Sequence, residues 1–387
     1  VLLFLPHCII DAAAGGGYFH YAGDFNDQQI NFYQYANAFV KQGGTFSWAT
    51  DLGSGFVNSY SFYLLGSPFF WLSLAVPARL MPWAMVPLLC LKMAVAGDGA
   101  YLWARRWVRE EGWSMLAGCL YAFSGFSIYN IFFNHFLDVV ALFPYLLAAL
   151  DDAAIDGKKG RFPFWVALNL LNNYFFFAGQ AVFLIIYFFC MVAGRRYRIG
   201  LRRFAALAWE TALGCACGCL LLLPAGLSLL QNPRTIDPFT GYGYLFYGKS
   251  QQYGAIFYSP FLMPDAPYFK DMFQEGILKH TSLTAYLPLV GAAGGLAFCR
   301  TQDRHPFTRI LKVCVVCAFV PVLNSAFYAL QLLRPLVLYA DPCAVRRYLL
   351  PALPPGPGRA QPAARLWADD LHHADGGGLC RAAQQGQ

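Results

Sequence analysis

Long apolar runs separated by short polar or basic segments make up most of the chain from residue 84 onward. About 20 apolar residues are enough for a helix to cross a bilayer. The pattern predicts eight membrane-spanning helices, at residues 84–104, 113–131, 136–150, 163–177, 178–193, 204–230, 284–299 and 311–330. The two runs within 163–193 are short for two crossings, so one tilted helix is the alternative there.

The segment before these runs has a different pattern. The apolar stretch 1–10 is too short to cross a bilayer, and we interpret residues 1–12 as the remnant of a first transmembrane helix, with a signal-sequence remnant as the alternative. Residues 13–83 mix many aromatic side chains with scattered polar ones, which predicts a long loop outside the membrane with interfacial helices. A second loop of this kind is predicted at 231–283.

Composition supports an all-α, polytopic integral membrane protein. Hydrophobic residues make up 58% of the chain and charged residues 13%, whereas charged residues make up about 25% of a soluble domain. The net charge of +7 comes from basic residues in short runs between apolar segments, not from a basic surface suited to nucleic acid. We therefore expect the lipid bilayer as a partner and no nucleic acid.

The basic runs also predict orientation, because Lys and Arg concentrate in short cytoplasmic loops. Four such runs occur, at 105–109, 158–161, 195–203 and 300–312. All four fall on one side if eight helices cross the membrane, so that side is predicted to be cytoplasmic. The agreement favours two helices within 163–193, and it places the loops 13–83 and 231–283 on the outer face.

The twelve cysteines do not predict a metal site. Most lie inside apolar runs, where Cys behaves as a small hydrophobic residue. Cys314 and Cys317 have the spacing of a CxxC pair, but no second pair accompanies them.

Polar side chains converge on the predicted outer face, and as a set they suggest a site, although solvation alone would explain any single one. Asp24 precedes the aromatic-rich stretch 25–35 and is the first candidate for a general base. Asp27 lies one turn later and would share its face in a helix, the alternative being a helix cap or a solvent-facing residue. Asn134, His135 and Asp138 have the spacing to line one helical face at the mouth of a span, with His135 as an ordinary interfacial residue as its alternative.

Lys92 lies inside a predicted span, where an unpaired charge costs several kcal/mol. Two interpretations are open. Its ammonium group meets a phosphate head group, or its side chain extends along the apolar surface to water.

Several motifs, in their order and spacing, resemble the first outer loop and following spans of the bacterial YfhO-like membrane proteins, which belong to the GT-C class of glycosyltransferases. The resemblance covers about residues 20–330, roughly the amino-terminal half of a typical member. The matching residues are Asp24 with Gln28, Trp48, Asp51-Leu52-Gly53-Ser54-Gly55, the segment 60–69, Lys92, Asn134-His135-Phe136-Leu137-Asp138 before Pro144, Asn172-Asn173-Tyr174, and the segment 282–289.

The resemblance implies a GT-C type fold with a long first exofacial loop in the bacterial cell membrane. It also implies transfer of a sugar from a polyprenyl-phosphate donor to an acceptor on the outer face, such as a teichoic-acid-type cell-envelope polymer. Asp24 matches the catalytic acid of the class, whereas Asp27 departs from the commonest pattern. No cofactor is certain, and a divalent metal would have Asp24 and Asp27 as its candidate ligands.

The chemistry of such a transfer fits the residues themselves. A carboxylate such as Asp24 would take the proton of the acceptor hydroxyl, a contribution of about 10²- to 10⁴-fold. The leaving lipid phosphate needs a cation, for which Lys92, His135 and Arg79 are candidates. A single displacement predicts inversion at the sugar carbon. The full set of candidate substrate-binding residues is Lys92, Asn134, His135, Asp138, Arg79, Asp51, Asn173 and Tyr174.

Two other classes of function are alternatives. A transporter or flippase of lipid-linked sugars would need polar sites near the membrane midplane and an internal repeat, whereas the polar residues gather at one edge and no repeat is evident. A non-catalytic membrane scaffold would tolerate the loss of Asp24.

The tail from residue 331 onward has a different composition from the rest. It lacks Phe, Ile, Ser, Thr, Asn, Lys and Met, and is dominated by Ala, Gly, Pro and Arg. Residues 332–342 can be encoded by a set of codons that, read one base later, gives Tyr-Ala-Arg-Trp, which resembles a motif expected next in the YfhO-like family. We therefore predict that residues 331–387 are a frameshifted, disordered product, and that the chain lacks the Arg of that motif.

Overall fold

The computed structural model describes residues 17–230 except 22, 45 and 109, together with 289–302 and 305–318 and a few isolated positions. The chain divides into two units, Val1–Leu332 and Leu333–Gln387, and no residue of the second unit is described. The predicted frameshifted tail, nearly all of the loop 231–283 and most of the segment 1–12 therefore lie outside the described residues.

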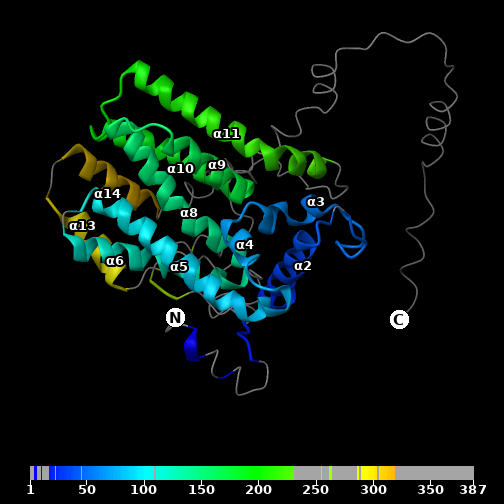
Figure 1. Ribbon diagram of the computed structural model, residues 1–387. Helices are drawn as coiled ribbons and strands as arrows, with labels where there is room; N and C mark the ends of the chain where they lie inside the picture. Colours follow the sequence, from blue (N-terminus) through cyan, green and yellow to red (C-terminus); the bar gives the residue numbers. More distant parts are fainter. Residues whose placement is uncertain are drawn as a thin grey trace, which may run out of the picture. The chain divides into compact units, whose positions relative to one another are not determined.

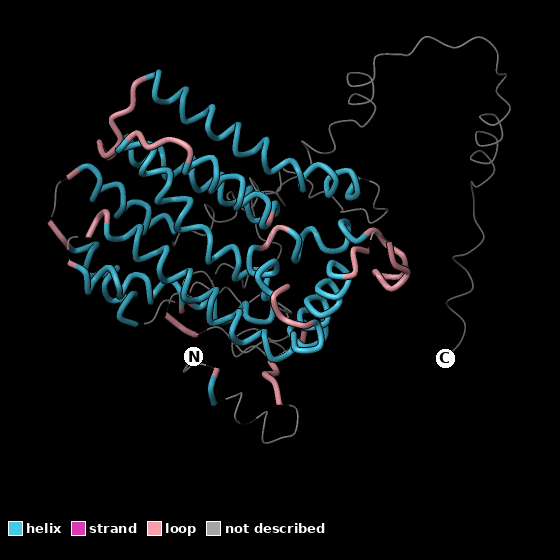
Figure 2. Tube along the Cα trace, viewed as in Figure 1, coloured by secondary structure: helices cyan, strands magenta, loops and turns pink. Residues whose placement is uncertain are grey.

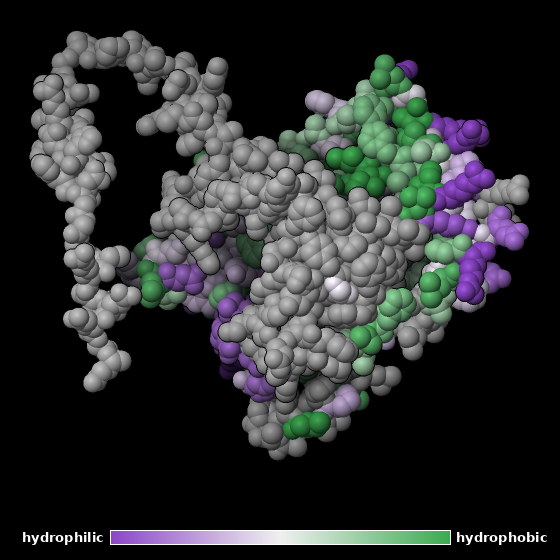
Figure 3. All heavy atoms as spheres, turned by 180° about the vertical axis from the view of Figure 1, so that it is seen from behind, coloured by the Kyte–Doolittle hydropathy of each residue, from purple (hydrophilic) through white to green (hydrophobic). Residues whose placement is uncertain are grey.

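The described residues form helices and no strands (Figures 1 and 2), which confirms the all-α prediction. Four helical segments are long and apolar enough to cross a membrane: Ala78–Arg105, Glu111–Phe132, Tyr174–Ala193 and Leu201–Leu227. Hydrophobic side chains gather over the top of the described surface in Figure 3, where α11 lies in Figure 1. The chain is thus an all-α polytopic membrane protein.

A helix is present at each of the eight predicted apolar runs. These helices are α5 (Met81–Arg105), α6 (Glu111–Ala122), α8 (Asn134–Asp151), α9 (Arg161–Asn172), α10 (Tyr174–Ala193), α11 (Leu201–Leu230), α13 (Leu289–Arg300) and α14 (Pro306–Ala318). Between α6 and α8 lie a short helix α7 (Gly125–Tyr129) and the 3-10 turn Asn130–Phe132.

The run within 163–193 is two helices, but the break lies earlier than the predicted boundary at 177–178. Asn173 is extended, with φ −158°. Its side-chain Oδ1 accepts a hydrogen bond of 3.1 Å from the Phe176 backbone N–H, which caps the start of α10. A polar cap therefore separates the two helices within an apolar sequence.

The helices α5, α6, α8, α9 and α11 pack as neighbours. Helix α5 contacts α6 and α8, α8 contacts α9, and α9 contacts α11 (Figure 1). Buried apolar side chains such as Leu146, Val166 and Leu170 fill the space between α8, α9 and their neighbours. This packing holds the first turn of α8 beside the middle of α5.

The loop 17–80 is largely helical, as predicted. It contains a π-helical turn η1 (Phe25–Gln29), α2 (Ile30–Lys41), α3 (Phe56–Tyr60), a second π-helical turn η2 (Ser61–Leu65), α4 (Pro68–Ser73) and a 3-10 turn η3 (Ala78–Leu80). Helices α2 and α4 pack on α5, and η2 packs on α9. Phe25, Tyr33 and Phe70 form a buried aromatic core with Met81 and Phe132, which anchors the loop to α5 and to the turn before α8.

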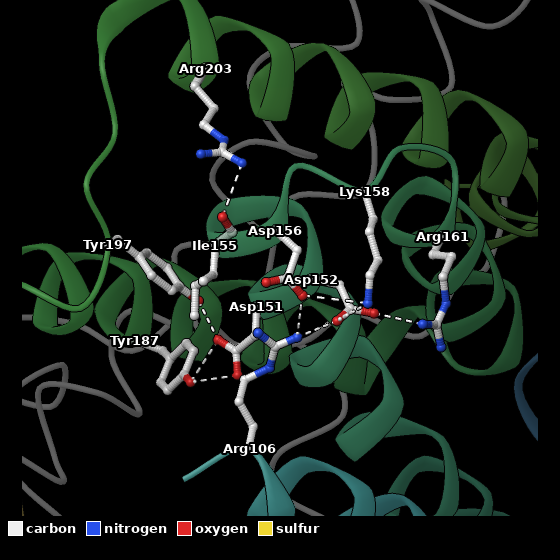
Figure 4. A network of polar contacts seen from close by, with 10 residues as sticks. All are labelled: Arg106, Asp151, Asp152, Ile155, Asp156, Lys158, Arg161, Tyr187, Tyr197 and Arg203. Carbon is white, nitrogen blue, oxygen red and sulfur yellow. Dashed lines mark hydrogen bonds and ion pairs between the residues drawn. The ribbon is translucent and has the colours of Figure 1, made fainter.

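A charged network lies where α8 ends and α9 begins (Figure 4). Arg106 pairs with Asp152 and, at 2.9 Å, with Asp156, while Lys158 and Arg161 reach Asp152 at 3.2 and 2.6 Å. Arg203 donates to the backbone oxygen of Ile155 at 3.2 Å.

A second set of contacts involves the fourth basic run, at 300–312. The guanidinium of Arg196 lies 4.9 Å from the Phe307 ring centre and 5.8 Å from that of Trp107. All four basic runs therefore meet at one end of the helices, which is the arrangement that the eight-helix count requires.

Candidate functional site

A buried ion pair between Lys92 and Asp138 forms the centre of the candidate site. Lys92, on α5, is 0% exposed, and its Nζ lies 2.5 Å from Asp138 Oδ1 in the first turns of α8. It also donates to Asn134 Oδ1 at 2.8 Å and to the Asn134 backbone oxygen at 3.2 Å. The interpretation that Lys92 extends to the outer surface is therefore wrong, because a carboxylate in the protein interior neutralises it.

Asn134 and Asp138 share a helical face, as their four-residue spacing predicted, because both contact the same ammonium group. The loop contributes Tyr33 of α2, whose hydroxyl lies 3.3 Å from Lys92 Nζ. Burial, followed by the charge of Asp138, raises the pKa of Tyr33, so the phenol stays protonated.

Sequence reasoning missed Tyr33 and Gln29, although the sequence contains a signal for both. Phe25, Gln29, Tyr33 and Asn37 recur every four residues, and all four are fully buried. Polar residues at this helical spacing indicate a face turned toward protein rather than water.

His135 faces a different part of the loop from Asn134. Its Nδ1 lies 3.4 Å from Gln29 Oε1, and the rings of Phe62 and Tyr63 meet the imidazole edge-on at 5.1 and 4.8 Å between centres. His135 is 3% exposed, so it is not an ordinary interfacial residue facing water. The aromatic pair of η2 covers it.

Asp24 and Asp51 come from separate segments of the loop but act on the same side chain. Burial, then the charge of Asp24 and then that of Asp51 raise the pKa of Tyr63. The Tyr63 ring packs on His135, so the charges of both acids act on a side chain of the buried cluster. Asp24 is half-buried and accepts a hydrogen bond of 3.4 Å from Gln28 Nε2, whereas Asp51 is exposed.

Asn173 and Tyr174 join the cluster through Phe62. Asn173 Nδ2 donates to the Phe62 backbone oxygen at 3.2 Å, and the Tyr174 ring lies 6.1 Å from that of Phe62. Next to this contact, Gly66 of the loop lies against Leu171, with so little space that a Cβ would stand 1.6 Å from the Leu171 oxygen. The turn between α9 and α10 is therefore pressed directly against η2.

Two predicted site residues lie apart from this cluster. Asp27 is exposed on η1, and its backbone oxygen accepts from Asn31 Nδ2 at 2.9 Å. Arg79 is exposed on η3. No hydrogen bond or ion pair within the described part of the chain joins either side chain to the other site residues.

The residues do not form a recognisable metal centre. In the described ranges, no group of three or more His, Cys, Asp or Glu side chains is close enough to hold a metal ion. The suggestion that Asp24 and Asp27 bind a divalent metal stays a prediction, and no step proposed below passes through a metal.

The cluster retains hydrogen-bonding capacity. Gln29 Nε2, His135 Nε2 and Asn172 Oδ1 are buried and make no hydrogen bond within the described residues. Buried groups of this kind usually bind water or a ligand. Together with the half-buried Asp24, they offer donors, an acceptor and a base for a hydroxyl-bearing substrate at the end of the helix bundle.

Comparison with known proteins gives one family match. The sequence model described as "Bacterial membrane protein YfhO" matches residues 1–268, which include every candidate site residue. No curated protein and no solved structure matches the chain. The matched range begins earlier and ends earlier than the resemblance at 20–330.

Proposed function

The chain belongs to the family of bacterial membrane protein YfhO, and from this premise we propose that it is a membrane glycosyltransferase. In this proposal, the enzyme moves a sugar from a polyprenyl-phosphate donor to an acceptor on the outer face of the membrane. The observation that carries the proposal is that Tyr63 of the loop packs on His135 at the start of α8, while the charge of the half-buried Asp24 in the same loop raises the pKa of Tyr63.

Asp24 is the proposed general base. A base for this reaction must reach an acceptor that arrives from outside the protein, and the half-buried position of Asp24 on the loop allows this. Gln28 donates its amide to one carboxylate oxygen of Asp24 at 3.4 Å, which orients the carboxylate. As the hydroxyl oxygen attacks the anomeric carbon, its proton passes to Asp24 and the sugar–phosphate bond breaks in a single displacement.

The leaving phosphate needs positive charge or hydrogen-bond donors. Asp138 already neutralises Lys92, so we give Lys92 a positioning role: it fixes α8 and Tyr33 relative to α5. Burial, then the charge of Lys92, lowers the pKa of His135 to about 3, so its imidazole is neutral and not a cation. Arg79, which is exposed on η3, is the remaining candidate cation, and we assign the donor phosphate to it and the sugar hydroxyls to Asn134, Asn173 and their neighbours.

The orientation proposed for the enzyme follows from its charges. The basic runs at 105–109, 158–161 and 195–203 meet at the end of the helices opposite the candidate site. Since basic loops stay in the cytoplasm, the site would face outward. A teichoic-acid-type cell-envelope polymer is an acceptor accessible from that face.

The experiment is a transfer assay in membranes with a panel of polyprenyl-phosphate sugars, using the chain as sequenced and a version with the predicted frame restored. Transfer with inversion at the anomeric carbon supports the proposal. Retained configuration would refute the single displacement. Translocation of the lipid-linked sugar without transfer would instead establish the flippase alternative.

A further inference from the structure

The connection between α2 and α3 exposes hydrophobic side chains to an unusual degree. Trp48 is 79% exposed, Leu52 98% and Phe46 56%. Adjacent exposed groups of this kind mark a site of interaction more often than a chance feature of the surface. Apart from Asp51, the loop defined by residues 46–54 has no role in the function proposed above.

Internal contacts fix the backbone of the loop. Thr50 is buried, and its hydroxyl lies 2.6 Å from the Tyr35 hydroxyl. Its backbone oxygen accepts from the N–H groups of Gly53 and Ser54 at 2.9 and 2.7 Å. Asp51 and Leu52 have φ of 41° and 62°, a region that bulky side chains rarely adopt and that is found at binding sites.

The indole of Trp48 is held in place by its neighbours. A Cβ on Gly53 would lie 2.8 Å from the Trp48 ring, so the glycine lets the ring pack across the backbone. The Phe46 ring meets Trp48 edge-on at 5.2 Å. Because Trp48 is nonetheless mostly exposed, the loop presents a fixed aromatic surface to the surroundings.

The chemistry of the loop indicates the kind of partner. Sugar rings have apolar C–H faces, which stack on aromatic rings, and a rim of hydroxyls, which hydrogen bond to carboxylates and amides. The exposed Asp51 supplies a carboxylate within the loop, and the exposed Asn58, whose amide donates to Ser54 Oγ at 3.5 Å, supplies an amide next to it. Within residues 42–78, Asp51 is the single charged side chain, which disfavours anionic lipid head groups because these attract basic segments.

We propose that Trp48, Asp51 and Leu52 form a subsite for a neutral, hydroxyl-rich carbohydrate unit. Its place in catalysis rests on the proposed transferase function, in which it holds a carbohydrate unit of the acceptor.

The test measures binding of neutral hexose oligosaccharides to the full chain in detergent, without any donor. Trp48→Ala removes the stacking surface and should weaken binding about tenfold, whereas Trp48→Phe should retain most of it. Gly53→Ala displaces the indole and should also weaken binding. The matched control is Trp113→Ala, because Trp113 is likewise exposed at 61% but lies on α6.

Equal affinity of the Trp48→Ala and Trp113→Ala variants, or no binding by the unsubstituted chain, would overturn the subsite. A second measurement tests a membrane role for the loop. Brominated lipids that quench the fluorescence of the unsubstituted chain more than that of Trp48→Phe would place Trp48 in the bilayer and also overturn the proposal. Because no transfer is measured, failure of this subsite and failure of the transferase function are distinguishable.

Discussion

At the scale of single residues, the Lys92–Asp138 pair shows how burial determines the role of a charge. Both side chains are essentially inaccessible to water, so each has lost its hydration, and their attraction offsets that loss only while both partners are present. The pair therefore specifies which parts of α5, α8 and α2 meet, rather than adding much net stability.

Removing one partner should be far worse than removing both. Lys92→Met leaves Asp138 buried without a counter-charge and should destabilise the protein by about 3–5 kcal/mol. The double variant Lys92→Met/Asp138→Leu should recover most of that loss. Unfolding in detergent measures both, and a double variant less stable than the single one would contradict this account of the pair.

The sequence predicted part of this residue-scale arrangement. The four-residue spacing of Asn134 and Asp138 predicted their common face, and the position of Lys92 in an apolar run left two interpretations, a phosphate head group or access to water. The ion pair with Asp138 was not predicted, because it depends on the packing of α5 against α8. No local pattern contains that packing, nor the packing of Tyr63 on His135.

At the scale of elements, the contact between η2 and the turn before α10 joins the loop to the helix bundle. The polar pair Asn172-Asn173 interrupts the apolar run 163–193 and is the sequence signal for the helix boundary, which the predicted boundary at 177–178 missed. Asn173 sets the boundary by capping α10 and donating to Phe62. The pairing of this turn with Phe62 required the tertiary structure.

Gly66→Ala should break this contact. The new methyl group would overlap the Leu171 backbone, and a backbone cannot move aside as a flexible side chain can. We expect a stability loss of about 1–3 kcal/mol and lower transfer activity. Gly112→Ala is the control, since nothing lies within 4 Å of its added Cβ; equal melting temperatures for the two variants would show that the contact is not close.

The opposite end of the helices should respond to acid. The hydrogen bond from Arg106 lowers the pKa of Asp156 from its usual 3.8. A carboxyl group whose pKa is lower in the folded state than in the unfolded state stabilises the folded state when the pH is above the unfolded-state pKa. This stabilisation is lost as the pH falls through the folded-state pKa. Amide exchange in residues 152–161, corrected for intrinsic rates, should therefore rise below about pH 4, and Asp156→Asn should exchange faster already at neutral pH. Equal amide exchange rates in residues 152–161 for Asp156→Asn and the unsubstituted chain would contradict a stabilising role of the Asp156 carboxylate.

At the scale of the whole molecule, the account depends on which end of the helices faces outward. Apolar runs predict eight membrane-spanning helices; the described residues form a helix at each run, of which four helical segments are long and apolar enough to cross a membrane. The orientation itself comes from charge alone, because the fold would be the same in either direction.

Labelling of single cysteines with a membrane-impermeant maleimide in intact cells tests this orientation. In a background without native cysteines, Asn58→Cys should be labelled directly, whereas Lys159→Cys should require permeabilisation. Both native side chains are exposed, so accessibility within the protein does not limit either reaction. The reverse pattern would place the candidate site in the cytoplasm.

The central claim is that Asp24 is the base of an outward-facing glycosyl transfer, and the most direct measurement compares two loop acids. Transfer from a polyprenyl-phosphate sugar is measured for Asp24→Asn and Asp27→Asn at equal membrane content. Asp24→Asn should lower kcat by about 10²- to 10⁴-fold. Asp27→Asn, at an exposed position without a described contact to the site, should lower it by less than about tenfold. Full turnover by Asp24→Asn would contradict the account.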